Sequence, residues 1–191
     1  FTTTALVAKL RAVTSLEIEI HANDDLGLAT ANTLAAIRAG ATHASVTVVG
    51  LGERAGNAPL EEIAVAAHTL YHINTGIDLM RLADVADVVA RASGRLIPEG
   101  KAIVGDAVFT HESGIHVSGL LKDKRSYEAL DPHLLGRQHR IVLGKHSGLS
   151  AVRAALARCG IADEPGTARA ALAIIKAYAT QTKRAVSLNR L

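Results

Sequence analysis

Apolar positions in the first part of the chain follow two different spacings, one typical of helices and one typical of strands. Residues 3–13 place Leu6, Leu10 and Val13 at helical intervals, and residues 16–20 then alternate apolar and acidic side chains, as a half-buried strand does. The same reasoning predicts a helix, a strand and a helix over residues 28–41, 44–49 and 60–73. This order of helix, strand, helix, strand, helix is typical of a parallel sheet covered by helices, and it predicts an α/β fold.

The second part of the chain has a different character. Its pattern predicts a helix, a short apolar stretch, a strand and two alanine-rich helices, at residues 79–92, 103–109, 140–143, 149–158 and 167–184. We therefore place a domain boundary near residues 73–80, with residues 1–73 in the α/β part and residues 74–191 in mainly helical subdomains.

Composition narrows the class of protein. The 191 residues allow one or two domains, and 49% hydrophobic with 20% charged residues exclude a disordered or low-complexity chain. A net charge of +3 and 3% aromatic residues give little support for a nucleic-acid partner. The sequence shows neither a membrane-spanning apolar run nor a signal peptide, so we expect no membrane partner and a cytoplasmic location. The single cysteine, Cys159, excludes an internal disulfide and a cysteine-based zinc cage.

Polar residues crowd just after the predicted strands, which is where α/β folds carry their chemistry. His21 follows the first strand and Asn23 lies two residues further on, so both side chains point to one face if the strand continues. Imidazole with oxygen ligands suits a divalent ion such as Mg²⁺, Mn²⁺ or Zn²⁺. In the structural alternative, His21 is a hydrogen-bonded strand end and Asp24 or Asp25 caps the next helix.

The loop after the second strand reads GLGERAGN, at residues 50–57. Its glycines allow sharp turns, and Glu53 and Arg54 offer an ion pair. Asn57 can cap the helix that starts near Pro59, or it can bind a metal or a substrate. The sequence leaves both interpretations open.

A third cluster of polar residues lies in the segment FTHESGIHVSG. His116 in this segment is followed eleven residues later by Tyr127, and a histidine with a tyrosine can act as base and hydrogen-bond donor around a carbonyl substrate. His111 and Glu112 can equally belong to a polar surface turn. The segment GKHSG, at residues 144–148, lacks the glycine spacing of a P-loop, so we interpret it as a structural turn.

Five segments in a fixed order carry a resemblance to a known family: HANDDLGLATAN, GLGERAGNAPLEE, FTHESGIHVSGLL, YEALDP and GKHSG. They resemble the C-terminal half of the acyl-CoA-dependent Claisen-condensing enzymes, the family of 2-isopropylmalate synthase and homocitrate synthase, and most of all the nitrogen-fixation type of homocitrate synthase. The resemblance implies the last two strands of a (β/α)8 TIM barrel followed by small, mainly helical subdomains. We therefore expect an incomplete fragment that does not catalyse the reaction alone.

The resemblance also implies roles for individual residues. It assigns metal binding to His21, Asn23 and Asn57, and substrate binding to Thr47. It assigns catalytic roles to His116 and Tyr127. The two catalytic residues resemble ones that reach into the active site of the other subunit, which implies a homodimer. Three positions depart from the family pattern, where Asn23 replaces a histidine, Val49 an asparagine and Ser118 an acidic residue.

The implied reaction joins acetyl-CoA to 2-oxoglutarate and, with water, gives homocitrate and CoA, using a divalent metal. The alternatives within the class are a 2-isopropylmalate synthase-like enzyme that takes 2-oxoisovalerate and a related lyase. Outside that class, a degenerate half-barrel can serve as a non-catalytic interaction module, because an open two-stranded sheet exposes apolar faces and unpaired backbone groups.

Overall fold

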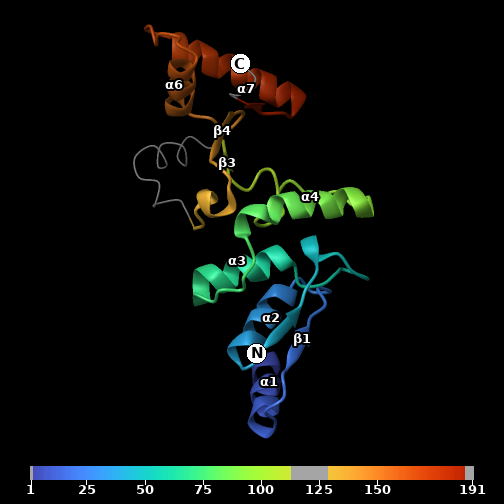
Figure 1. Cartoon of the computed structure of the whole chain (residues 1–191). Coiled ribbons are helices and arrows are strands. Elements are labelled where there is room, and N and C mark those ends of the chain that lie inside the picture. Colours follow the sequence, from blue (N-terminus) through green and yellow to red (C-terminus); the bar gives the residue numbers. More distant parts are fainter. Residues whose placement is uncertain (1, 113–128, 188–191) are drawn as a thin grey trace. The chain divides into compact units, whose positions relative to one another are not determined.

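The computed structural model describes residues 2–112 and 129–187. The chain divides into two compact units, Phe1–Val108 and Phe109–Leu191, which Figure 1 colours along the sequence from blue to red. The boundary that the sequence suggests, near residues 73–80, falls inside the first unit and stays a prediction.

The first unit alternates helices with two short strands. Its elements are α1 (Thr2–Val13), β1 (Glu19–His21), α2 (Ala29–Arg38), β2 (His43–Ser45), the 3-10 turn η1 (Val48–Gly50), α3 (Leu60–Tyr71), the 3-10 turn η2 (Leu79–Arg81) and α4 (Leu82–Ser93). Strands β1 and β2 are parallel, with Ile20 opposite Ala44. Helix α2 links them, and Figure 1 shows it beside β1. These observations confirm the predicted α/β fold and the parallel pairing.

The second strand is shorter than predicted. The prediction extends over residues 44–49, but β2 ends at Ser45 and η1 occupies the last part of the segment. Val49 in this turn has φ 52° and ψ 19°, a left-handed conformation that an extended strand cannot contain. The turn therefore redirects the chain toward α3 well before the apolar run is over.

Two small clusters of apolar side chains hold the first unit together. In one, Val7, Ala36 and Ala41 pack against Ile18 and Ile20, which fixes α1 and α2 to β1. The second cluster is centred on Ala29, Ala58 and Ile63. It attaches the start of α2 to α3, so the segments that leave both strands are held by buried contacts.

Helix α1 has the predicted helical spacing, but its core contact is a different residue. Leu6, Leu10 and Val13 are 57%, 43% and 81% exposed, whereas Val7 is buried. The apolar stripe of α1 therefore lies outside the core of the first unit.

The second unit is built on a small three-stranded sheet that the sequence does not predict in full. Its elements are β3 (Thr110–His111), the 3-10 turn η4 (Pro132–Leu135), β4 (Arg140–Leu143), α6 (Leu149–Arg158), α7 (Thr167–Thr182) and β5 (Val186–Ser187). Strand β4 pairs with β3 in parallel and with β5 in antiparallel orientation. Leu143 packs with Val152 and Ala168, so the two predicted alanine-rich helices are confirmed and cover this sheet. None of the helices that the structure describes is both long and apolar enough to cross a membrane.

Candidate functional site

The chain that leaves β1 pairs with the loop that precedes α3. The backbone N–H of Asp24 donates to the carbonyl of Gly56 over 2.8 Å, and the N–H of Ala58 donates to the carbonyl of Ala22 over 3.1 Å. These two bonds flank Asn23 and Asn57, which therefore form an antiparallel bridge without a direct hydrogen bond between their backbones. In such a pair the two side chains share one face and lie close together. The fold thus brings together two of the predicted metal-binding positions.

His21 is the last residue of β1 and is exposed. It lies opposite Ser45 of β2, and its Nδ1 is 3.2 Å from the Ser45 hydroxyl. This contact engages Nδ1 and not the other ring nitrogen, Nε2. Because His21 and Asn23 are two residues apart on extended chain, their side chains lie on the same face. The imidazole is therefore exposed at the end of β1, on the same side of the chain as Asn23.

The glycine loop holds Asn57 in place, and it does so without a helix cap. The Asn57 amide Nδ2 donates to the carbonyl of Leu51 over 3.3 Å, which leaves Oδ1 as the acceptor of the side chain. The N-cap residue of α3 is Pro59, and no side chain caps the helix there. The interpretation of Asn57 as a helix cap is therefore wrong, because its amide is committed to its own loop.

The two aspartates after Asn23 have structural partners. Asp24 Oδ1 accepts a hydrogen bond from the N–H of Ala29, the first residue of α2, over 2.8 Å. Asp24 therefore binds an N–H at the start of α2, as the structural alternative expects, although the N-cap residue of the helix is Leu28.

Asp25 instead pairs with Arg54 through two contacts of 2.9 and 3.0 Å. The Arg54 guanidinium lowers the pKa of Asp25, mainly through these hydrogen bonds. The suggested pair of Glu53 with Arg54 is not formed, because Arg54 reaches across to the loop that follows β1. This ion pair ties together the two loops that carry Asn23 and Asn57.

Thr47 lies just before η1, with its backbone bound on both sides. Its N–H donates to the carbonyl of Ala58 and its carbonyl accepts from the N–H of Leu60. The Thr47 hydroxyl is buried and has no hydrogen-bond partner within the described residues. Among the described residues, the hydroxyl of Thr33 and Oε1 of Glu61 are buried without a hydrogen-bond partner in the same way.

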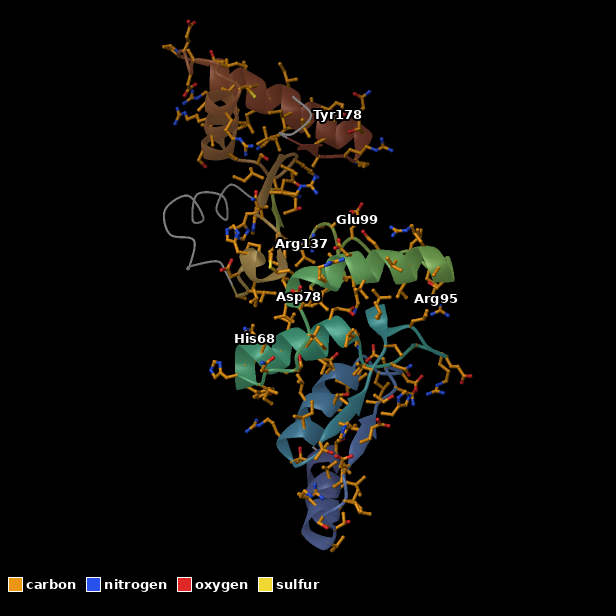
Figure 2. All side chains as sticks on the ribbon, in the orientation of Figure 1. His68, Asp78, Arg95, Glu99, Arg137 and Tyr178 are labelled. Carbon is orange, nitrogen blue, oxygen red and sulfur yellow. The ribbon has the colours of Figure 1, made fainter. Side chains whose placement is uncertain are left out.

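Glu61 and Glu62 of α3 form a charged cluster with Lys101. The sequence pattern does not predict this cluster. Glu61, at the start of α3, is 1% exposed, and its Oε2 accepts from the N–H of Val49 over 3.0 Å. Lys101 lies 3.5 Å from Glu61 Oε1 and also pairs with Glu62. Lys101 belongs to the loop after α4, and Figure 2 labels Glu99 of the same loop. The two adjacent acidic residues are visible in the sequence, but nothing in it points to a lysine so distant along the chain.

The two predicted catalytic residues, His116 and Tyr127, lie outside the described residues. Within the described ranges, no three histidine, cysteine or carboxylate side chains gather closely enough to hold a metal ion. The candidate site that the structure defines is therefore one imidazole and two amides at the end of β1, with Thr47 at the end of β2.

Comparison with known proteins shows which families these parts are similar to. Residues 2–89 match the HMGL-like family, and residues 103–183 match the family described as homocitrate synthase post-HMGL domain-like. The first part of the chain is therefore similar to the HMGL-like family, and the second part is similar to the domain described as following it in homocitrate synthase.

Individual relatives carry three related names. The chain is 50% identical to 2-isopropylmalate synthase 2 of Caldanaerobacter subterraneus subsp. tengcongensis over 80% of its length and 40% of the relative. It is 42% identical to homocitrate synthase 1 of Nostoc sp. over its whole length and 51% of that protein. A citramalate synthase assigned as putative, from Methanopyrus kandleri, is 50% identical over 75% of the chain and 28% of the relative. The chain thus spans about half, or less, of the length of these relatives.

Proposed function

We propose that this chain contributes the metal and substrate positions of an acyltransferase that condenses acetyl-CoA with a 2-oxo acid. One observation carries the proposal: Asn23 and Asn57 face each other across an antiparallel bridge, directly after the strand that ends in His21. Residues from two separate loops thereby reach one open edge of the sheet. The names of the relatives, all synthases of related kinds, support the same class of reaction.

The donor atoms at this edge fit a divalent ion. His21 offers Nε2, and the two amides offer Oδ1 atoms, a mixed nitrogen and oxygen set that Mg²⁺, Mn²⁺ or Zn²⁺ accepts. The hydroxyl of Ser45 beside Nδ1 would fix the orientation of the His21 ring, as partners of metal-binding histidines commonly do. Because Asp24 and Asp25 are engaged elsewhere, the described residues supply only neutral ligands.

When bound, the metal supplies Lewis-acid polarisation of the ketone of the 2-oxo acid. Thr47 would donate a hydrogen bond from its hydroxyl to the distal carboxylate of the substrate, a role that we assign from the resemblance. His116 would remove a proton from the methyl group of acetyl-CoA, and Tyr127 would donate a hydrogen bond beside it. We assign these last two roles from their motif, in a homodimer whose subunits exchange them.

We propose 2-oxoglutarate as the 2-oxo acid, so that acetyl-CoA, 2-oxoglutarate and water give homocitrate and CoA. Relatives named homocitrate synthase, from Nostoc sp. and from Frankia alni at 53% identity over 74% of the chain, support this choice. The relative named 2-isopropylmalate synthase supports the alternative, 2-oxoisovalerate. The two substrates differ at the far end, where one carries a carboxylate and the other a branched alkyl group.

A chimaera tests the proposal directly. In it, these 191 residues replace the matched segment of the Nostoc homocitrate synthase 1, which is 42% identical. With Mn²⁺ and acetyl-CoA, we expect release of free thiol to be faster with 2-oxoglutarate than with 2-oxoisovalerate. Thr47→Val in the chimaera should raise KM for 2-oxoglutarate by about tenfold, the effect of one lost hydrogen bond to a charged group.

Two controls separate the possible failures. A chimaera with Thr69→Val changes another hydroxyl of the first unit, one that is bonded within α3, and should keep the KM of the parent chimaera. A folded chimaera that prefers 2-oxoisovalerate would assign the alternative substrate. A folded chimaera that releases no thiol with either acid, although the Nostoc enzyme does, would refute the proposed function.

A further inference from the structure

The second unit contains a pocket lined by basic side chains that lies apart from the residues proposed for catalysis. Its volume is about 210 Å³, and its charged lining consists of Lys145, His146, Lys183, Arg184 and one acidic residue, Glu112. We call this the basic pocket. Its basic residues come from two segments, the turn before α6 and the chain just after α7.

One wall of the basic pocket is the GKHSG turn. The N–H of Gly144 donates to the hydroxyl of Ser147 over 2.9 Å, and the N–H of Ser147 donates back to the carbonyl of Gly144 over 3.2 Å. Ser147 is 2% exposed, so the turn is anchored in the unit. This confirms the interpretation of the segment as a structural turn. It also leaves Lys145 and His146 exposed at the tip.

Glu112 holds this turn in place through two hydrogen bonds. Its Oε1 accepts from the N–H of His146 over 2.9 Å, and its backbone carbonyl accepts from the Ser147 hydroxyl over 3.3 Å. The carboxylate approaches Gly144 so closely that a Cβ there would lie 2.6 Å from Oε1. The Glu112 carboxylate therefore packs against the turn and accepts a hydrogen bond from its backbone.

The other wall is the end of α7. Lys183 is the C-cap residue, with φ 57°, and its N–H donates to the carbonyl of Ala179 over 3.0 Å. The N–H of Arg184 donates to the Thr182 hydroxyl over 3.3 Å. These bonds fix the backbone where the helix stops, opposite the GKHSG turn across the basic pocket.

The basic pocket carries more positive than negative charge, because Lys145, Lys183 and Arg184 face a single carboxylate, Glu112, among its lining residues. Within the described part of the chain, no carboxylate forms an ion pair with Lys145, Lys183 or Arg184. Positive side chains that converge in a concave site raise the local concentration of anions. The volume is below the roughly 300–1,000 Å³ of sites that enclose a drug-sized ligand, so the basic pocket suits a compact anionic group of a larger molecule.

We propose that the basic pocket binds phosphate groups, with arginine and lysine as donors from opposite walls. For the source of these phosphates the inference rests on the proposed function, because acetyl-CoA carries both a pyrophosphate and a 3′-phosphate. Free inorganic phosphates have the same chemistry and are distinguished from coenzyme A by the probes used.

Calorimetry on the full 191-residue chain, in buffer without divalent metal and without 2-oxo acid, tests the inference. The probes are inorganic pyrophosphate, coenzyme A and coenzyme A that lacks the 3′-phosphate. The pocket variant combines Lys145→Ala with Arg184→Ala, one change on each wall. The matched control combines Arg158→Ala with Lys176→Ala, two exposed cations of α6 and α7 outside the pocket lining. Circular dichroism checks that both variants fold.

We expect the pocket variant to bind pyrophosphate about tenfold more weakly or worse, since it loses charge-assisted hydrogen bonds, and the control to bind like the parent. If the pocket variant also binds coenzyme A more weakly by a similar factor, the phosphates that the basic pocket binds are those of the coenzyme. A loss confined to pyrophosphate identifies free phosphates. Binding that is absent for every probe, or equal in the pocket variant and the control, would overturn the inference. These results would be the same if the proposed metal site were wrong, because the buffer contains no divalent metal.

Discussion

The backbone N–H of Val49 donates a hydrogen bond to the buried carboxylate of Glu61, 3.0 Å away. Val49 reaches this position only by adopting φ 52°, which is left-handed and unfavourable for a β-branched residue. Lys101 offsets the charge of Glu61 from the opposite side, at 3.5 Å. The turn that ends β2 is therefore fixed by a long-range polar contact at the cost of local backbone strain.

Val49→Asn should remove this strain. Asparagine tolerates the left-handed region better than valine, so the free energy of unfolding should rise by about 1 kcal/mol. Urea denaturation of the 191-residue chain measures the change. Val48→Asn is the matched control, because Val48 is in the same turn without a positive φ, and it should not stabilise the protein. Equal effects of both substitutions would contradict the strain argument.

Gly56→Ala should disrupt the loop that carries Asn57. A Cβ at Gly56 would lie 2.1 Å from the carbonyl oxygen of Gly50, and φ there is 93°. Backbone cannot yield as a flexible side chain can, so we expect a loss of about 2 kcal/mol or more in unfolding free energy. The same substitution should weaken Mn²⁺ binding, measured by calorimetry.

Gly27→Ala is the control for that experiment. Gly27 also has a positive φ, 69°, but an added Cβ would meet nothing within 4 Å. Only the conformational cost of about 1 kcal/mol is expected there. If Gly27→Ala destabilised the protein as much as Gly56→Ala, the close approach to Gly50 would not be the cause.

Asp25→Asn should reduce stability at neutral pH and have a smaller effect in acid. Arg54 lowers the folded pKa of Asp25 below the unfolded value of about 3.9. The ion pair therefore stabilises the folded state above that unfolded pKa, and the contribution disappears as pH falls through the folded pKa. Unfolding free energies of the parent and the variant at pH 7 and pH 3 measure it. The exposed Asp87 provides the control, Asp87→Asn. A parent–variant difference that stays constant with pH would exclude this role for the pair.

Asn23→His should tighten binding of Zn²⁺ or Mn²⁺ by about tenfold or more, because imidazole is a stronger ligand than an amide oxygen for these ions. Asn23 lies on the face shared with His21 and opposite Asn57, so the new ring would point to the same edge. Isothermal calorimetry with the parent as reference measures the affinity. Asn74→His, in an exposed loop after α3, should leave it unchanged. An unaltered affinity in Asn23→His would show that position 23 does not ligate the metal.

Local patterns in the sequence are enough to predict the alternation of helices and strands. The helices α3, α6 and α7 follow the predicted ranges closely, because each presents a long apolar period that the sequence itself records. The position of His21 at a strand end is predicted for the same reason. Strands β3 and β5 have two residues each, which is too short for any period to show.

Long-range pairing was decided only by the tertiary structure. The sequence offers Glu53 as the neighbour of Arg54, but the fold selects Asp25 because the two loops meet at the Asn23–Asn57 bridge. The fold likewise leaves Leu6 of α1 exposed and buries Val7. Periodicity reports which residues share a face of one element, whereas the approach of separate elements depends on how the chain turns between them. At Val49 that turn uses a left-handed conformation, which the apolar, strand-like pattern of the segment does not predict.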